Sequence, residues 1–257
     1  MNKTFNFYFF LFNFLITFLL IEGLYHHFYY KISSIFSFIP FKNQSGHNTL
    51  IWDENGMVEN LQVILLFFSI VIFIVFLKKN IYEKKFTVFY YLYFLALCYY
   101  FFEEISWGQH LIGWQTPSFF SDINQQNETN FHNSSNLFNE LPRNLLFIWC
   151  GLSFMLIKIT YLKYFNFLIF PNFNLKKISI LILFFYLPNF LVDRLNLYPG
   201  HPALNPIDIK INTILDIVTF NFIRLSELHE LLFNYYILSH AYYLLKKMEH
   251  QRYTNTK

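Results

Sequence analysis

Charge is what this sequence of 257 residues has least of: Asp, Glu, Lys and Arg together make up 14%, against roughly 25% in an ordinary soluble domain. Its 7 glycines and 8 prolines exclude collagen-like and proline-rich disordered chains. Only 2 cysteines are present, so no disulfide framework is predicted. Hydrophobic residues make up 55%. A soluble domain cannot cover so much apolar surface with so few charges, and the composition therefore predicts a membrane protein.

Six stretches of 14 to 18 residues lack any charged side chain, at 4–21, 60–77, 86–102, 144–157, 178–192 and 231–245. A helix needs about 20 mostly apolar residues to cross about 30 Å of hydrocarbon. With their flanks, these stretches reach that length. The sequence predicts an all-α, polytopic membrane bundle in which 1–257 form one integral membrane domain. Its six expected spans lie at about 4–23, 58–77, 86–105, 143–162, 177–195 and 226–245.

The basic residues are distributed unevenly among the loops between these spans. With the N-terminus in the cytoplasm, twelve Lys and Arg residues lie on the inner side and five on the outer side. This bias predicts a multi-pass protein of the cell membrane with both termini cytoplasmic. The formal net charge of +3 then reflects membrane topology, and no basic soluble domain is available to bind nucleic acid. The lipid bilayer is the expected partner.

Ionisable side chains gather near the outer ends of the predicted spans. An ordinary interfacial position explains any one of them, because charges become costly only deeper in the bilayer. Together they predict a polar site at the boundary of the outer leaflet. Glu103, Ser106 and His110 follow the i, i+3, i+7 spacing of one helical stripe, and Glu227 and Glu230 share a face of the last span. Carboxylates this close need a cation, a proton or a metal between them.

The predicted outer loops add further candidates. The loop after the third span is rich in Asn and Gln, and Glu128 and His132 would lie one turn apart if it were helical. His201 lies in a proline-punctuated loop that is expected over the mouth of the bundle. The candidate catalytic residues are Glu103, Glu104, Ser106, Glu128 and Glu227. The candidate metal ligands are His110, His132, His201 and Glu230.

The string Glu103-Glu104-Ile105-Ser106-Trp107-Gly108-Gln109 resembles the signature of a family of bacterial multi-pass membrane proteins with no assigned activity. The resemblance covers roughly residues 52–149. It implies a membrane topology and the location of a site, and it implies no reaction. A fainter similarity is to the alkaline ceramidase-like membrane hydrolases, which use Ser, Asp and His around zinc in a seven-helix bundle. That likeness implies Ser106 as a nucleophile beside His110, although six spans are predicted here and Glu replaces much of the His set.

Three functions remain open from the sequence. The first is a membrane hydrolase in which a divalent metal, zinc by preference, activates water against a lipid or lipid-linked substrate. The second is a non-catalytic assembly or binding module that presents its outer loops to a partner. The third is a proton-coupled transporter, although the inner halves of the spans carry few polar groups to continue a path. The sequence specifies neither the substrate nor the oligomeric state.

Overall fold

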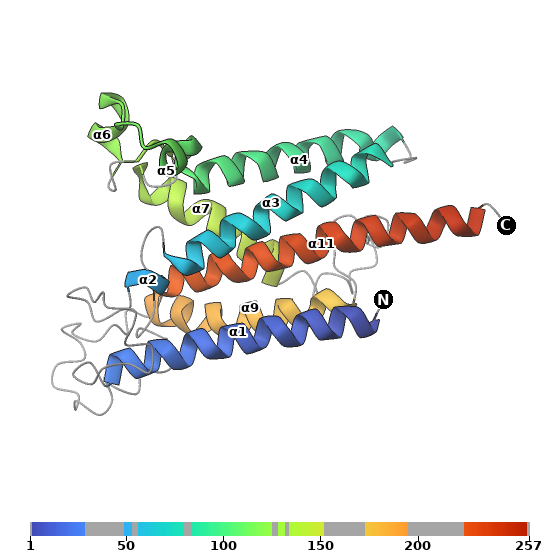
Figure 1. Cartoon of the computed structure of the whole chain (residues 1–257), viewed down its shortest axis with the longest axis horizontal. Coiled ribbons are helices and arrows are strands. Elements are labelled where there is room, and N and C mark those ends of the chain that lie inside the picture. Colours follow the sequence, from blue (N-terminus) through green and yellow to red (C-terminus); the bar gives the residue numbers. More distant parts are fainter. Residues whose placement is uncertain are drawn as a thin grey trace. The chain divides into compact units, whose positions relative to one another are not determined.

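A computed structural model describes residues 2–28, 49–52, 56–79, 84–124, 128–131, 134–151, 173–194 and 224–255. In these ranges the chain is helical and contains no strand, which confirms the all-α prediction (Figure 1). The elements are α1 (Asn2–Phe28), α2 (Thr49–Trp52), α3 (Met57–Lys78), α4 (Lys84–Glu104), η1 (Ser106–Gly108), α5 (Gln109–Ile112), α6 (Ser118–Ile123), α7 (Asn136–Leu146), η3 (Phe147–Gly151), α9 (Phe173–Arg194) and α11 (Leu225–Asn255).

Helices occupy the regions of all six expected spans, although the fourth is described only as far as Gly151. Among the described residues, one helix is both long and apolar enough to cross a membrane by itself, Met57–Lys78, with a mean hydropathy of 2.7. A shorter apolar stretch, Tyr8–Ile21, lies in α1. The structure therefore supports one candidate span, and the sixfold crossing and the cytoplasmic termini stay predictions.

The helices group into two compact units, each described here by itself. Unit 1 comprises residues 1–60 and 180–231. Helix α1 buries Phe12, Ile16 and Leu19 at helical spacing. The start of α11 packs on α9, because the His229 ring lies 4.6 Å from the Tyr186 ring, centroid to centroid.

Unit 2 comprises residues 61–179 and 232–257 and contains α4 together with most of α3 and α11. Its core is formed by one stripe of each helix: Phe73 and Phe76 of α3, Tyr90 and Leu97 of α4, and Ile237, Ala241, Leu244 and Met248 of α11. Aromatic rings make the closest contacts, with Phe73 and Tyr93 centroids 4.9 Å apart and perpendicular. The three helices run side by side, with α4 antiparallel to α3 (Figure 1).

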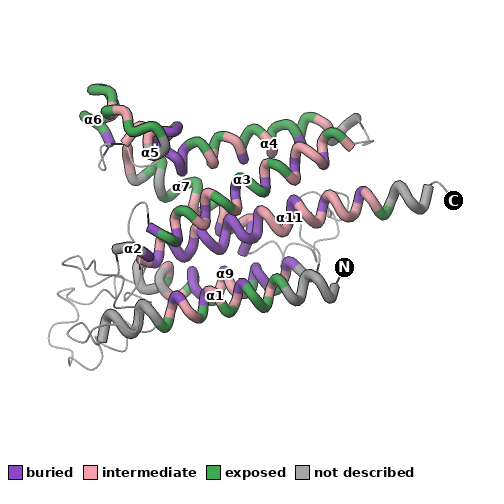
Figure 2. Tube along the Cα trace, in the orientation of Figure 1, coloured by how far each residue is buried: buried purple, intermediate pink, exposed green. Residues whose placement is uncertain are grey.

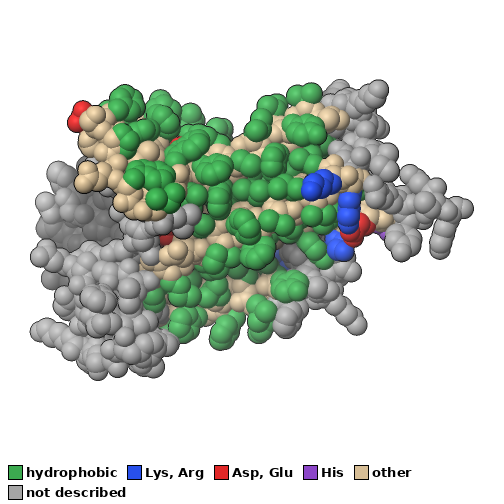
Figure 3. Space-filling view, turned by 45° about the horizontal axis from the view of Figure 1, so that its top comes forward, with side chains coloured by type: hydrophobic (Ala, Val, Ile, Leu, Met, Phe, Trp, Pro, Cys, Tyr) green, Lys and Arg blue, Asp and Glu red, His purple; other side chains and the backbone are tan. Residues whose placement is uncertain are grey.

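The outer surfaces of these helices are apolar rather than charged. Helix α4 exposes hydrophobic side chains every three or four residues along its length: Val88, Leu92, Leu95, Tyr99 and Phe102 (Figure 2). Helix α3 also exposes hydrophobic side chains, at Ile64, Phe67 and Val71. Only 28% of its most apolar 18-residue stretch is buried. On the face drawn in Figure 3, hydrophobic side chains cover the surface between the helix ends, and Lys and Glu gather at one end.

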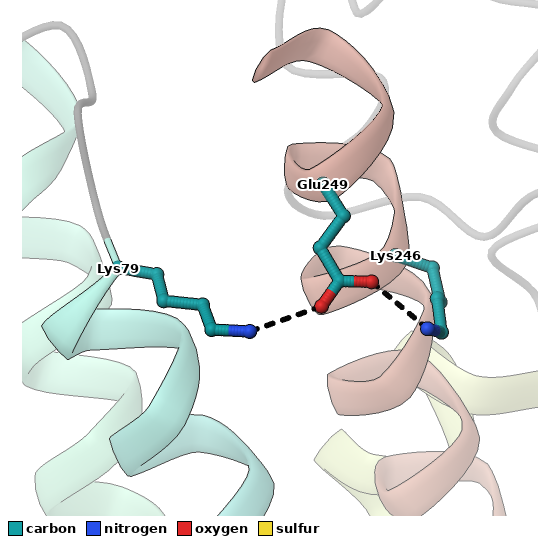
Figure 4. Close-up of polar contacts among 3 residues, drawn as sticks. All are labelled: Lys79, Lys246 and Glu249. Atoms are coloured by element: carbon teal, nitrogen blue, oxygen red, sulfur yellow. Dashed lines mark hydrogen bonds and ion pairs between the residues drawn. The ribbon is translucent and has the colours of Figure 1, made fainter. Parts of the chain in front are cut away.

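An ion cluster joins α3 to α11 at that end of unit 2 (Figure 4). Lys79, directly after α3, places its Nζ 3.0 Å from Glu249 Oε1, and Lys246 Nζ lies 2.8 Å from the other oxygen. Hydrogen bonds from Lys246 and then from Lys79 lower the pKa of Glu249. Glu249 raises the pKa of Lys246 in return. The carboxylate therefore links two helices that are far apart in sequence.

Replacing Glu249 with Gln is expected to lower stability at pH 7 by at most about 1 kcal/mol, because both ion pairs are partly exposed. Since the folded pKa of Glu249 is depressed, its contribution is present above the usual value near 4.5 and is lost as the pH falls through the folded pKa. Thermal unfolding of both proteins from pH 7 to pH 3 should show the difference shrinking. A difference that is independent of both pH and salt would contradict the ion-pair account.

Candidate functional site

The candidate site of unit 2 begins with an abrupt end to α4. The helix stops at Glu104, and the next residues form a turn in which Ser106, Trp107 and Gly108 have φ angles of 46°, 55° and 100°. A left-handed conformation costs an L-residue roughly 1–2 kcal/mol. The predicted helical stripe through Glu103, Ser106 and His110 is therefore wrong, because no continuous helix connects these positions.

The Ser106 side chain lies in a polar cluster with Glu128 and Asn130. Ser106 Oγ donates a hydrogen bond to Glu128 Oε2 at 3.0 Å and accepts one from Asn130 Nδ2 at 3.0 Å. Asn130 Nδ2 also donates to Glu128 Oε2 at 2.6 Å. Ser106 and Asn130 are both 0% exposed. Burial removes water as a competitor, so these hydrogen bonds determine where the 128–131 segment lies.

Asn124 fixes the same segment from its other side. Its side-chain nitrogen donates to both oxygens of Asn130, the carbonyl at 2.9 Å and Oδ1 at 2.7 Å. Its side-chain oxygen accepts from the Glu128 amide at 3.2 Å. Asn124 follows α6 directly, so the end of that short helix is bound to residues 128–130. Glu128 is not part of a helix, so the prediction that it pairs with His132 across one helical turn is not supported at Glu128.

Gln109, the last residue of the signature string, hydrogen-bonds to two segments of the loop, at 114–116 and at Thr129. Its Nε2 donates to Thr116 Oγ1 at 2.8 Å and to the Trp114 carbonyl at 3.3 Å. Its Oε1 accepts from the Thr129 amide at 2.7 Å. Trp114 Nε1 in turn donates to Thr129 Oγ1 at 3.3 Å. One glutamine thus satisfies backbone groups from two separate segments.

Glu103 completes the arrangement from the end of α4. One oxygen accepts from Trp107 Nε1 and the other from the Phe131 amide, both at 2.8 Å. The Trp107 ring also stacks on Phe102, with centroids 5.4 Å apart and planes at 13°. Glu103 is 3% exposed. We call the following residues the loop lock, because together they tie residues 105–124 and 128–131 to the end of α4: Glu103, Ser106, Gln109, Asn124, Glu128 and Asn130.

The structure also places other residues that were predicted from the sequence. Glu104 is buried beside Glu103 at the end of α4. Glu227 and Glu230 lie in unit 1, where Arg224 Nε approaches Glu227 Oε1 at 3.4 Å. His110 lies in α5, but its side chain is outside the described part, as are all of His132 and His201. The described residues contain no group of three or more His, Cys, Asp or Glu that could hold a metal.

Sequence reasoning selected the carboxylates and the serine and overlooked their amide partners. Gln109, Asn124 and Asn130 supply most of the hydrogen bonds of the loop lock. A usable signal was present, because the predicted loop is crowded with Asn and Gln but nearly free of charge. Amide side chains donate and accept at once, so they satisfy buried backbone groups without burying charge.

Comparison of the chain with protein-family models, with curated proteins and with solved structures found no match. The resemblances that the signature string carries are therefore predictions from the residues alone. The hydrogen bonds made by that string do not depend on any family resemblance. Glu103, Ser106, Trp107 and Gln109 each make a hydrogen bond that shapes the following loop.

Replacing Glu103 with Gln should loosen the 128–131 segment while the helices stay folded. The amide keeps one acceptor but offers an NH₂ group to the second donor, and charge-assisted hydrogen bonds are worth about 1.5–3 kcal/mol. Hydrogen exchange at the Phe131 amide is expected to accelerate by about 10- to 100-fold. Glu140→Gln, an exposed position on α7, is the matched control. Unchanged exchange at Phe131 would show that the Glu103 bond is unimportant.

Gly108 and Gly113 form a second matched pair, since both have positive φ. An alanine Cβ at Gly108 would lie 3.3 Å from the Trp114 ring, whereas at Gly113 it would meet nothing within 4 Å. We expect Gly113→Ala to cost about 1–2 kcal/mol from backbone strain alone. Gly108→Ala should cost more and shift the tryptophan emission, because Trp114 must move. Equal unfolding temperatures for the two variants would refute this role of Gly108.

Proposed function

We propose that this chain is a multi-pass membrane protein that acts as a non-catalytic binding module. Its helices anchor it, and its loop lock holds a platform, residues 105–124 and 128–131, on the extracytoplasmic side for a partner. The observation that carries the proposal is the use of polar groups inside the protein: Ser106 and Asn130 are fully buried and hydrogen-bonded to each other and to Glu128.

The exposed surface of unit 2 supports the membrane location. Helix α4 has 21 residues, which corresponds to about 31 Å at a rise of 1.5 Å and matches the hydrocarbon thickness. Its exposed residues over that length are apolar or aromatic. The Lys79 cluster lies at one end of this unit and the loop lock at the other. The cationic end is the expected cytoplasmic end.

Rigidity supports a binding role over a mechanical or transport role. A binding surface that is ordered in advance loses less conformational entropy when a partner docks. The loop lock orders an irregular segment through hydrogen bonds that are buried or partly buried. The exposed polar side chains of that segment, such as Gln115 and Ser118, are left to face outward.

The experiment is photo-crosslinking in intact cells, with benzoylphenylalanine placed at Gln115 and, as a control, at the exposed Leu95 of α4. We expect a discrete protein adduct at Gln115 that falls several-fold when Glu103→Gln is added, and no such adduct at Leu95. The comparison requires that the protein with Glu103→Gln is still found in the membrane fraction. An absent Gln115 adduct, or one that is insensitive to Glu103→Gln, would contradict the binding module.

A hydrolase is the second candidate, and one geometric observation favours it. Ser106 combines a left-handed backbone conformation with a hydrogen bond to a carboxylate, and strained residues concentrate at functional sites. In that mechanism Glu128 accepts the Ser106 proton while Oγ attacks the carbonyl carbon of a lipid ester or amide. The bond to the alcohol or amine then breaks, Glu128 returns the proton to that leaving group, and water hydrolyses the acyl-serine. A zinc-dependent version would also require His110 and His132. Labelling of Ser106 by a fluorophosphonate, reduced by Glu128→Gln, would favour the hydrolase and reject the binding module.

A further inference from the structure

The platform carries a set of large, exposed apolar and aromatic side chains. Trp107, Ile112, Phe119 and Ile123 are 43%, 76%, 62% and 40% exposed. Phe119 and Ile123 are four residues apart and share one face of α6. Water-facing loops seldom hold so many large apolar groups in the open, so this arrangement indicates a less polar surrounding on one side of the platform.

Helix α7 has the same character. Leu137, Leu141 and Leu145 recur every four residues and are 65%, 50% and 57% exposed, and Phe138 beside them is 53% exposed. Arg143 and Asn144 are half-buried instead. Helix α7 continues directly into η3 (Phe147–Gly151), where the fourth expected span begins. Its first turns therefore present an apolar face at the level where that span would enter the bilayer, as expected for residues at the membrane interface.

Continuity with α4 identifies what covers this surface. The exposed row of α4 ends at Phe102, and the Trp107 ring of the platform stacks directly on that residue. The Trp107 N–H remains bound to Glu103, so an apolar ring and a polar tip meet at the end of the helix. Tryptophan favours this position at a membrane–water interface. Charge agrees, because Asp122 and Glu128 are the only charged residues from 105 to 139.

We infer that the platform is itself seated in the outer leaflet, with the apolar faces of α6 and α7 inserted at the boundary between headgroups and acyl chains. This inference rests on the proposed membrane location and deepens it by naming phospholipid as the surface on which the platform lies. Gln115 then faces the aqueous side, which leaves it available to a partner. The proposed binding surface is thereby held at a fixed height above the bilayer.

The experiment measures depth by spin labelling of the full chain in phospholipid nanodiscs. Single cysteines are introduced at Phe119 and Leu141, with Leu95 and Gln115 as deep and aqueous controls, in a Cys98→Ala background that retains the buried Cys150. All four positions are exposed, so the labels disturb no core contact. Power saturation with oxygen and with a nickel chelate gives the depth of each label.

We expect Phe119 and Leu141 to lie about 5–10 Å below the lipid phosphates. Leu95 should lie deeper, and Gln115 should be accessible to the nickel chelate. If Phe119 and Leu141 are as accessible as Gln115 while Leu95 stays protected, the inference is overturned and the membrane location stands. If Leu95 is also open to the chelate, the membrane location itself is wrong.

Discussion

The hydrogen bonds of Glu103 are the constraint on which the rest of the candidate site depends. One carboxylate accepts from the indole that follows it and from the Phe131 amide, 28 residues later. These two bonds hold the chain in a left-handed turn that Ser106 and Trp107 would not adopt without support. Within this turn, Ser106 hydrogen-bonds to Glu128. Glu103 and Glu128 therefore act through one strained backbone segment rather than as a pair of carboxylates that face a substrate.

Composition and periodicity determined the fold class, because charge-free stretches of span length have few alternatives to helix. Both ends of α3, α4 and α9 were predictable to within a few residues, whereas α11 runs ten residues beyond the predicted end at 245. The turn after Glu104 was not, since nothing in Ser-Trp suggests positive φ and only the following Gly108 hints at it. A helical spacing drawn through that turn placed His110 on the wrong stripe. Local propensity was overridden by contacts with residues 128–131, which sequence distance conceals.

Some of the candidate residues chosen from the sequence lie in one hydrogen-bonded cluster, for a physical reason. Carboxylates near a predicted membrane boundary attract attention because burying them is costly, and Glu103 and Glu128 do carry the cluster. Hydroxyl, amide and indole donors offset that cost. Ser106 and Asn130 donate to Glu128, and Trp107 and the Phe131 amide donate to Glu103. Residue types alone could not distinguish a buried carboxylate with neutral donors from one awaiting a cation.

The two ends of unit 2 obey different electrostatic rules. At the Lys79 end, two ammonium groups share one partly exposed carboxylate, which leaves an excess of positive charge. At the other end, Glu103 is buried under neutral donors, and the exposed apolar side chains include Trp107, Phe119 and Ile123. A cationic end suits an anionic cytoplasmic leaflet, where each nearby basic residue contributes about 1 kcal/mol. An end rich in exposed aromatic and aliphatic side chains suits insertion at a headgroup boundary. This asymmetry supports the proposed orientation of the unit.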